Sequence, residues 1–142
     1  MRHHPDGFSP VDDDNIDITN SVLKSDILIF STPVYWYGMS GVMKNWIDRW
    51  SQTLRDPQIP FKSSMQQKTA YVILVGGDNP RIKGLPLILQ FQYIFDFMNM
   101  TFGGYIIGEA NTPGEILADK IAVEDAQNMN QKIRLSITKT GV

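Results

Sequence analysis

The feature of this sequence that most constrains its fold is a set of three short apolar runs, at residues 27–30, 69–75 and 102–107. Continuous apolar runs of this length are typical of strands that are covered on both faces in a parallel sheet. The third run is the weakest of the three, because Gly103 and Gly104 lower its strand propensity. The sequence therefore predicts about three strands in a parallel sheet.

Helical patterns separate the apolar runs. Apolar residues recur at helical spacing over residues 39–54 and 85–98, and again from residue 123 to about 135 or 138. A short helix over about residues 14–25 follows the acidic residues 12–14, because negative charge suits a helix N-terminus. Alternation of helix and strand predicts an α/β fold with right-handed crossovers.

Length and charge define the class of protein. A chain of 142 residues is long enough for one core, so we expect an irregular leader over residues 1–10 and one domain over residues 11–142. The net charge of −2 gives no reason to expect a nucleic acid partner. No apolar run approaches the roughly 20 residues that span a bilayer, so we expect no membrane partner and take the cytoplasm as the default location.

The chain contains no cysteine. Disulfides, thiolate zinc sites, iron–sulfur clusters and cysteine nucleophiles are therefore excluded from this chain, and any redox chemistry requires a bound cofactor. His3 and His4 are interpreted as solvated tail residues rather than metal ligands. The carboxylates of residues 12–14 do not converge on one point, so we expect no metal site.

The predicted sheet carries two loops at the carboxyl ends of its strands, where parallel sheets bind ligands. They span residues 32–41 and 76–84. Pro33 directs the first loop along a defined path, and the aromatics that follow either lie against a flat ligand or pack beneath a neighbouring helix. The glycine pair that opens the second loop either brings a backbone close to a ligand or forms an ordinary turn. The residues alone leave both pairs of alternatives open.

The stretch from Asp26 to Arg49 resembles the central motif of the NAD(P)H-dependent FMN reductase family; with one flanking residue at each end it reads SDILIFSTPVYWYGMSGVMKNWIDRW. The matching elements are the acidic residue before the strand, TPVYW, the following glycine, Met-Ser-Gly, and a helix that opens on Leu-Lys. Met43 in place of that leucine is the one departure in the helix. The resemblance implies a flavodoxin-like fold with three layers, α/β/α.

In that family the strand-end loop contacts the flavin ring, which implies a cofactor site in this chain. The implied FMN-binding residues are Thr32, Pro33, Val34, Tyr35, Trp36, Tyr37 and Gly38 from the first loop and Gly76, Gly77 and Asp78 from the second. The implied reaction takes hydride from NAD(P)H through FMN to a small-molecule acceptor such as a quinone or a nitroaromatic compound. No side chain need act as acid or base, so no catalytic residue is assigned.

The resemblance also shows what is missing. A first strand with a phosphate-binding loop is not found before the acidic helix, so we expect an N-terminally truncated sheet whose strand 27–30 has an unpaired edge. A non-catalytic interaction subunit, a remnant or a fragment that binds no flavin by itself is therefore the alternative.

Two further features stay open in the sequence. The apolar helix 85–98 either covers a partner subunit, which predicts a homodimer or higher oligomer, or is buried within one chain. Arg81 and Lys83 either read a ribose phosphate or form a solvated basic loop.

Overall fold

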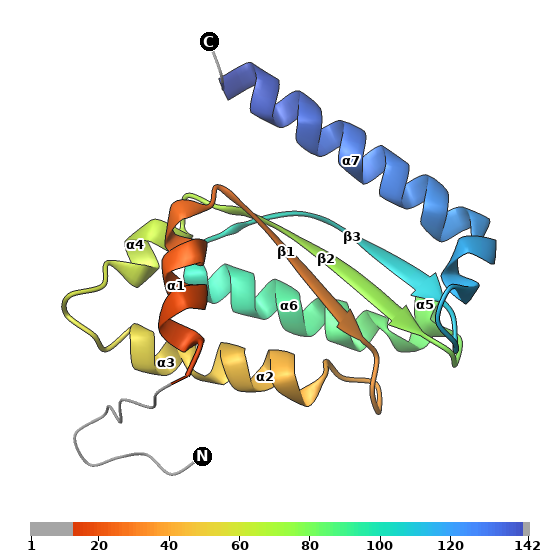
Figure 1. Ribbon diagram of the computed structural model, residues 1–142, viewed down its shortest axis with the longest axis horizontal. Helices are drawn as coiled ribbons and strands as arrows, with labels where there is room; N and C mark the ends of the chain where they lie inside the picture. The colour runs from red at the N-terminus through yellow and green to blue at the C-terminus, as the bar shows by residue number, and fades with distance from the viewer. Residues whose placement is uncertain (1–12, 141–142) are drawn as a thin grey trace.

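The computed structural model describes residues 13–140 and contains three parallel strands in one sheet. The strands are β1 (Ile27–Pro33), β2 (Thr69–Gly76) and β3 (Thr101–Glu109), in the spatial order β1-β2-β3 (Figure 1). All three predicted strands are confirmed, and each is longer than its apolar run. The predicted leader at residues 1–10 lies outside the described residues.

Helices connect and cover the strands. They are α1 (Asn15–Lys24), α2 (Gly41–Asp48), α3 (Trp50–Thr53), α4 (Phe61–Met65), α5 (Pro80–Lys83), α6 (Leu85–Met98), the 3-10 helix η1 (Glu115–Ala118) and α7 (Lys120–Thr140). The prediction of a helix over residues 85–98 is confirmed at both ends. None of the helices in the described part of the chain is long and apolar enough to cross a membrane.

The helix predicted over residues 39–54 is divided in the structure. It begins at Gly41, because Ser40 is the N-cap and its hydroxyl accepts a hydrogen bond from the Met43 N–H at 3.3 Å. It is interrupted at Arg49, which separates α2 from α3. Helices α4 and α5 were not predicted, since each has only four or five residues and is too short to show helical periodicity in the sequence.

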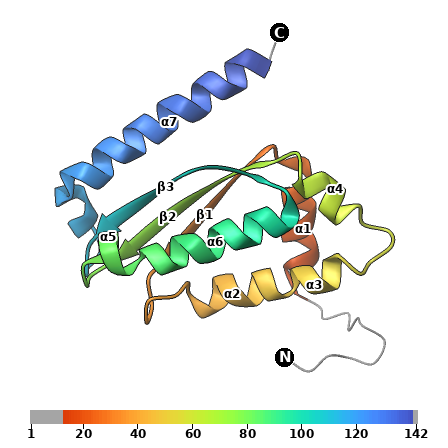
Figure 2. The ribbon, with the colours of Figure 1, turned by 180° about the vertical axis from the view of Figure 1, so that it is seen from behind.

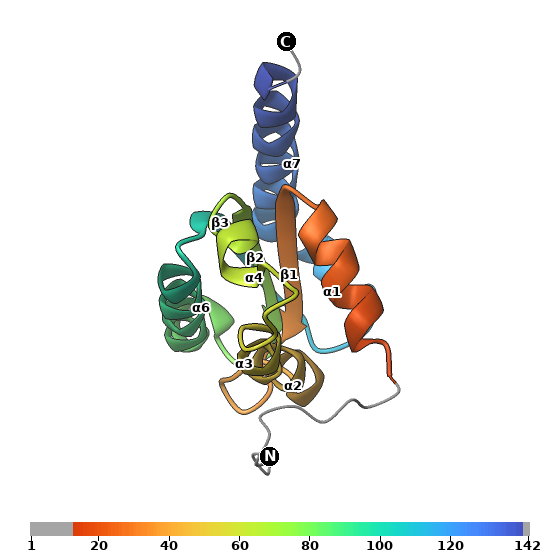
Figure 3. The same ribbon diagram turned by 90° about the vertical axis from the view of Figure 1, so that its left-hand side faces the viewer.

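The two faces of the sheet are covered unequally. Helices α2, α3 and α6 lie on one side, whereas α7 lies on the other and extends beyond the sheet (Figures 1 and 2). When the molecule is turned by 90° about the vertical axis, α1 is seen beside β1 (Figure 3). The expectation that the first strand is covered on both faces is therefore wrong within the described residues. Phe30 is buried, but its neighbour Ile29 on the opposite face is 52% exposed, because α7 packs chiefly against β3.

The core is an aromatic cluster between the sheet and the helices on its covered side. The Phe30 ring on β1 lies 5.9 Å from Trp46, 5.7 Å from Phe91 and 5.2 Å from Phe95, measured between ring centroids. Trp50 stacks edge-on against Trp46 at 5.2 Å. Contacts of this kind add about 0.5–1.5 kcal/mol per pair beyond burial. Both tryptophans of the α2–α3 segment are therefore structural.

Two phenylalanines of α6 test this description of the core. Phe95 is completely buried, whereas Phe97, two residues further along, is 63% exposed. We expect Phe95→Ala to lower the free energy of unfolding by about 3–5 kcal/mol, and Phe97→Ala by less than about 1 kcal/mol. Urea denaturation of the two variants makes the comparison. Equal losses would show that the core is not centred on this cluster.

Candidate functional site

The loops that follow β1 and β2 meet at one edge of the sheet. The strands pair in parallel with Pro33 opposite Val75, and the Val34 N–H continues the ladder by donating to the Val75 carbonyl at 2.8 Å. A pocket of about 270 Å³ opens between the loops. It is lined by Val34, Trp36, Tyr37, Gly76, Gly77, Asp78, Pro80, Lys83 and Asn111.

The first loop contains a strained two-residue turn. Tyr35 and Gly38 exchange backbone hydrogen bonds of 2.9 and 3.0 Å, which closes a tight antiparallel bridge. The two residues between them have positive φ, 48° at Trp36 and 62° at Tyr37. This geometry is that of a type I′ turn, which favours Asn and Gly and disfavours bulky side chains. The turn holds the Trp36 ring 96% exposed, with no packing to compensate for the strain.

A short polar network ties the turn to the second loop. The Tyr37 hydroxyl donates to the Asp78 carboxylate at 2.8 Å, and the Lys83 ammonium donates to the same oxygen at 2.7 Å. The hydrogen bond to the carboxylate raises the pKa of the Tyr37 phenol, so the phenol is neutral at neutral pH. The bond from Lys83, followed by that from Tyr37, lowers the pKa of Asp78. The network fixes the turn over the pocket without adding net charge.

A second set of hydrogen bonds fixes the base of the first loop. The Thr32 hydroxyl accepts a hydrogen bond from the Ser40 N–H at 2.9 Å and donates to the Pro33 carbonyl at 2.9 Å. Thr32 is buried, so its side chain supports the loop from below and does not line the pocket. Pro33, Tyr35 and Gly38 also lie outside the pocket lining.

The glycine pair at the end of β2 lies in close contact with side chains of the neighbouring loops. A Cβ atom at Gly76 would lie 3.1 Å from the Val34 side chain, and a Cβ at Gly77 would lie 1.7 Å from Asn111 Oδ1. Neither glycine has a positive φ. The two glycines thus make room for side chains from the loops that follow the neighbouring strands.

The loop after β3 is the third component of the site. Its Ala110 N–H donates to the Gly76 carbonyl at 3.0 Å, and the Asn111 and Thr112 N–H groups donate to the Glu115 carboxylate at 2.7 and 3.0 Å. These two backbone bonds lower the pKa of Glu115. The loop is therefore held in one shape with Asn111 beside Gly77.

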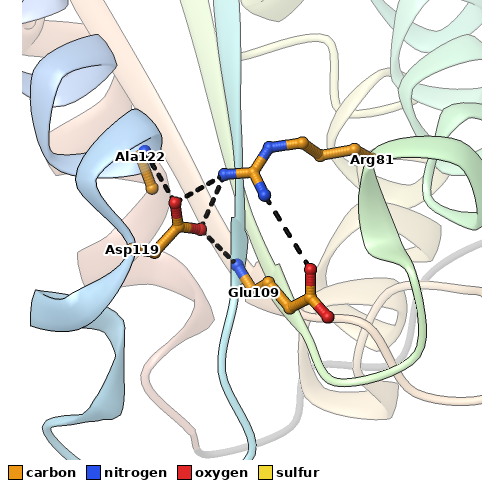
Figure 4. Close-up of polar contacts among 4 residues, drawn as sticks. All are labelled: Arg81, Glu109, Asp119 and Ala122. Atoms are coloured by element: carbon orange, nitrogen blue, oxygen red, sulfur yellow. Dashed lines mark hydrogen bonds and ion pairs between the residues drawn. The ribbon is translucent and has the colours of Figure 1, made fainter.

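Asp119 closes this loop and joins it to two helices (Figure 4). Its carboxylate accepts hydrogen bonds from the Glu109 N–H at 2.8 Å, from Arg81 Nη2 at 2.6 and 2.7 Å, and from the Ala122 N–H at 3.1 Å. The Asp119 side chain is only 9% exposed. The Glu109 N–H lowers the pKa of Asp119 to about 2, and Arg81 and the Ala122 N–H add to the effect. One carboxylate thus links the end of β3, α5 and the start of α7.

A family model described as "Flavodoxin-like fold" matches residues 2–133. The chain belongs to the flavodoxin-like fold family. The family-level resemblance read from the 26–49 motif and the predicted fold class are thereby confirmed.

This flavodoxin-like protein is similar in sequence to three proteins of known name or structure. A Bacillus subtilis protein, YwqN, provisionally named as an NAD(P)H-dependent FMN-containing oxidoreductase, is 58% identical over 130 residues, which are 91% of this chain and 72% of YwqN. The solved structure of a "Trp repressor binding protein" from Bacillus subtilis is 61% identical with a TM-score of 0.80, covering 85% of this chain and 73% of that one. An FMN-dependent NADH:quinone oxidoreductase of Thiobacillus denitrificans is 28% identical over 64 residues, 43% of this chain and 31% of that protein.

The pocket of this flavodoxin-like protein contains six of the ten residues implied by the motif and three residues outside that set. The three are Pro80, Lys83 and Asn111. Both basic residues of the second loop form ion pairs, Arg81 with Asp119 and Lys83 with Asp78. Whether either of them reads a ribose phosphate stays a prediction. Among residues 13–140 no group of three or more His, Cys, Asp or Glu side chains is arranged to hold a metal ion, and His3 and His4 lie outside that range.

The pKa of Asp119 predicts how stability depends on pH. Its folded-state pKa of about 2 lies below the ordinary value of 3.8, so ionised Asp119 stabilises the fold above pH 4 and this contribution is lost as the pH falls from about 4 to 2. We expect Asp119→Asn to lower the free energy of unfolding at pH 7 by about 1–3 kcal/mol and to flatten its decline below pH 4. Asp125→Asn, which removes an exposed carboxylate from α7, is the control. Parallel pH curves for the wild type and Asp119→Asn would contradict this assignment.

Proposed function

We propose that this chain binds FMN in the pocket between the strand-end loops and takes part in an NAD(P)H-dependent oxidoreductase reaction. The observation that carries the proposal is the type I′ turn that holds Trp36 almost fully exposed at the pocket in a strained conformation. Backbone strain persists where the surrounding structure enforces it, and it is concentrated at functional sites. The names of YwqN and of the quinone oxidoreductase support FMN as the cofactor and NAD(P)H as the electron donor.

The residues of the pocket fit a flat, polar-edged cofactor. Trp36 and Tyr37 offer aromatic faces, and the backbone at Gly76 and Gly77 forms a narrow wall beside them. Lys83 and Asp78 compensate each other, so the pocket accepts a neutral ring system without leaving a charge unpaired. When bound, FMN supplies the transfer of electrons from a nicotinamide to an acceptor.

The protein side chains then bind and orient rather than transfer protons. The raised pKa of Tyr37 keeps its phenol proton on the oxygen, where it is already donated to Asp78. We therefore assign no catalytic acid or base. A quinone or a nitroaromatic compound is the proposed acceptor, since either can stack as a flat ring on the open side of an exposed aromatic turn. The cytoplasm remains the proposed location.

An FMN titration of the chain tests this function. We expect saturable binding, and we expect Trp36→Asn to weaken it at least about tenfold through loss of stacking, which is worth about 1–3 kcal/mol per ring. The same substitution is expected to raise the free energy of unfolding by up to about 1 kcal/mol, because asparagine tolerates the positive φ. Flavin fluorescence and thermal unfolding give the two readouts.

Tyr105→Asn is the control for the titration, since Tyr105 is a half-exposed aromatic on β3 outside the pocket. If a folded wild-type protein does not bind FMN, the proposal is wrong and the interaction subunit becomes the better hypothesis. Equal weakening by both substitutions would place the cofactor elsewhere.

A stripe of apolar side chains on α6 supports a homodimer as a further part of the proposal. Leu85, Leu89, Tyr93 and Phe97 recur every four residues and are 44–64% exposed, whereas Leu87, Ile88, Phe91, Phe95 and Met98 on the same helix are buried. The buried face fits the interpretation that this helix packs within one chain, and the exposed face is the part that we propose a partner subunit covers. An exposed stripe of this kind is typical of a surface that another chain covers.

Light scattering measures the state of assembly directly. We expect a mass of twice 16.1 kDa for the wild type and a shift toward the monomer for Leu89→Lys. Leu117→Lys, on the exposed side of η1, should leave the mass unchanged. A monomeric wild type at micromolar concentration would exclude this dimer.

A further inference from the structure

The polar side chains that line the pocket differ in whether their hydrogen bonds are already used. Tyr37 and Lys83 both donate to Asp78, so these three groups satisfy one another. The Asn111 side-chain amide lines the same pocket and has no hydrogen-bond partner among the described residues. A carboxamide offers one acceptor oxygen and two N–H donors. Asn111 is therefore the polar lining side chain whose full hydrogen-bonding capacity is free for a ligand.

The backbone that carries this amide is closely defined. Its Oδ1 lies where a side chain at Gly77 would be, since a Cβ there would be 1.7 Å away. The backbone before it is bonded to Gly76 through Ala110, and its own N–H is held by Glu115. A free amide on a fixed backbone is the arrangement expected of a recognition group, because no backbone entropy of the loop has to be lost on binding.

We propose that the Asn111 carboxamide recognises the imide edge of the flavin, and that the ion pair of Arg81 with Asp119 positions the loop that carries it. This inference rests on the proposed FMN function. The flavin imide has one N–H flanked by two carbonyl groups, so a carboxamide can donate to one carbonyl and accept from the N–H. The Asp119 carboxylate binds the Glu109 N–H at one end of the loop and caps α7 at the other (Figure 4). Arg81 is the positioning residue that holds this carboxylate from α5.

Glu109 offers a matched comparison within the same cluster. Its side chain is 52% exposed and lies 3.9 Å from Arg81 Nη1, whereas Asp119 is nearly buried and accepts Arg81 at 2.6 Å. The contribution of Glu109 to the loop is its backbone N–H, which a change of side chain does not remove. Glu109→Gln should therefore leave the loop in place, and Asp119→Asn should release it.

The test compares FMN with 3-methyl-FMN, in which the imide N–H is replaced by a methyl group. We expect the wild type to prefer FMN by about tenfold in dissociation constant, the scale of one lost hydrogen bond. Asn111→Ala, an exposed position, should reduce that preference several-fold while thermal unfolding stays unchanged. Asn130→Ala, an exposed asparagine on α7, is the control. An unchanged preference in Asn111→Ala overturns the recognition role.

The positioning role is tested by the same preference and not by stability alone. Asp119→Asn and Arg81→Gln should each reduce the preference for FMN, and Asp119→Asn should have no further effect on it in the Asn111→Ala background. Glu109→Gln should retain the wild-type preference. If Asp119→Asn lowers the unfolding temperature but keeps the preference, the ion pair is only structural and the positioning role is wrong. Failure of the wild type to bind FMN at all overturns the proposed function and this inference together, whereas binding without discrimination overturns the inference alone.

Discussion

The parallel pairing of β1 with β2 is the constraint on which the site depends. Adjacent parallel strands end at the same edge of a sheet, so their following loops must lie together. The ladder continues one step past Pro33, through the Val34 N–H and the Val75 carbonyl, and so carries the first loop directly to the second. The hydrogen bond from the Ala110 N–H to the Gly76 carbonyl does the same for the loop that follows β3. Backbone hydrogen bonds thereby bring three consecutive loops to the same edge of the sheet.

Side chains then decide what the converged backbone can bind. The turn at Trp36 and Tyr37 is locally unfavourable, and it is held because both of its flanks are fixed. Thr32 binds the backbone at the base of the loop, and Asp78 binds the phenol of Tyr37 at its tip. These contacts replace the packing that an exposed aromatic ring lacks. The stability of the aromatic core beneath allows this strain to be retained.

Much of this architecture could be predicted from the sequence. Short apolar runs indicated all three strands, and the motif from Asp26 to Arg49 indicated the first pocket loop together with the fold family. The third loop could not be predicted in the same way. Its position depends on the register of β3 against β2, which shifts between Ala70 and Tyr71. An irregularity of this kind changes which residues end beside each other, and it leaves no periodic signal in the sequence.

The glycine pair shows why residue types alone gave an incomplete description of the site. Glycines after a strand favour either a turn or a close backbone approach to a ligand, and both interpretations assume that the missing side chain leaves free space. In this fold Val34 and Pro80 fill the space at Gly76, and Asn111 fills it at Gly77. The pair therefore marks the point where three loops converge, because the absent Cβ atoms leave room for side chains from the two outer loops. A polar side chain brought in by that approach, rather than the glycines themselves, presents hydrogen-bonding groups to the pocket.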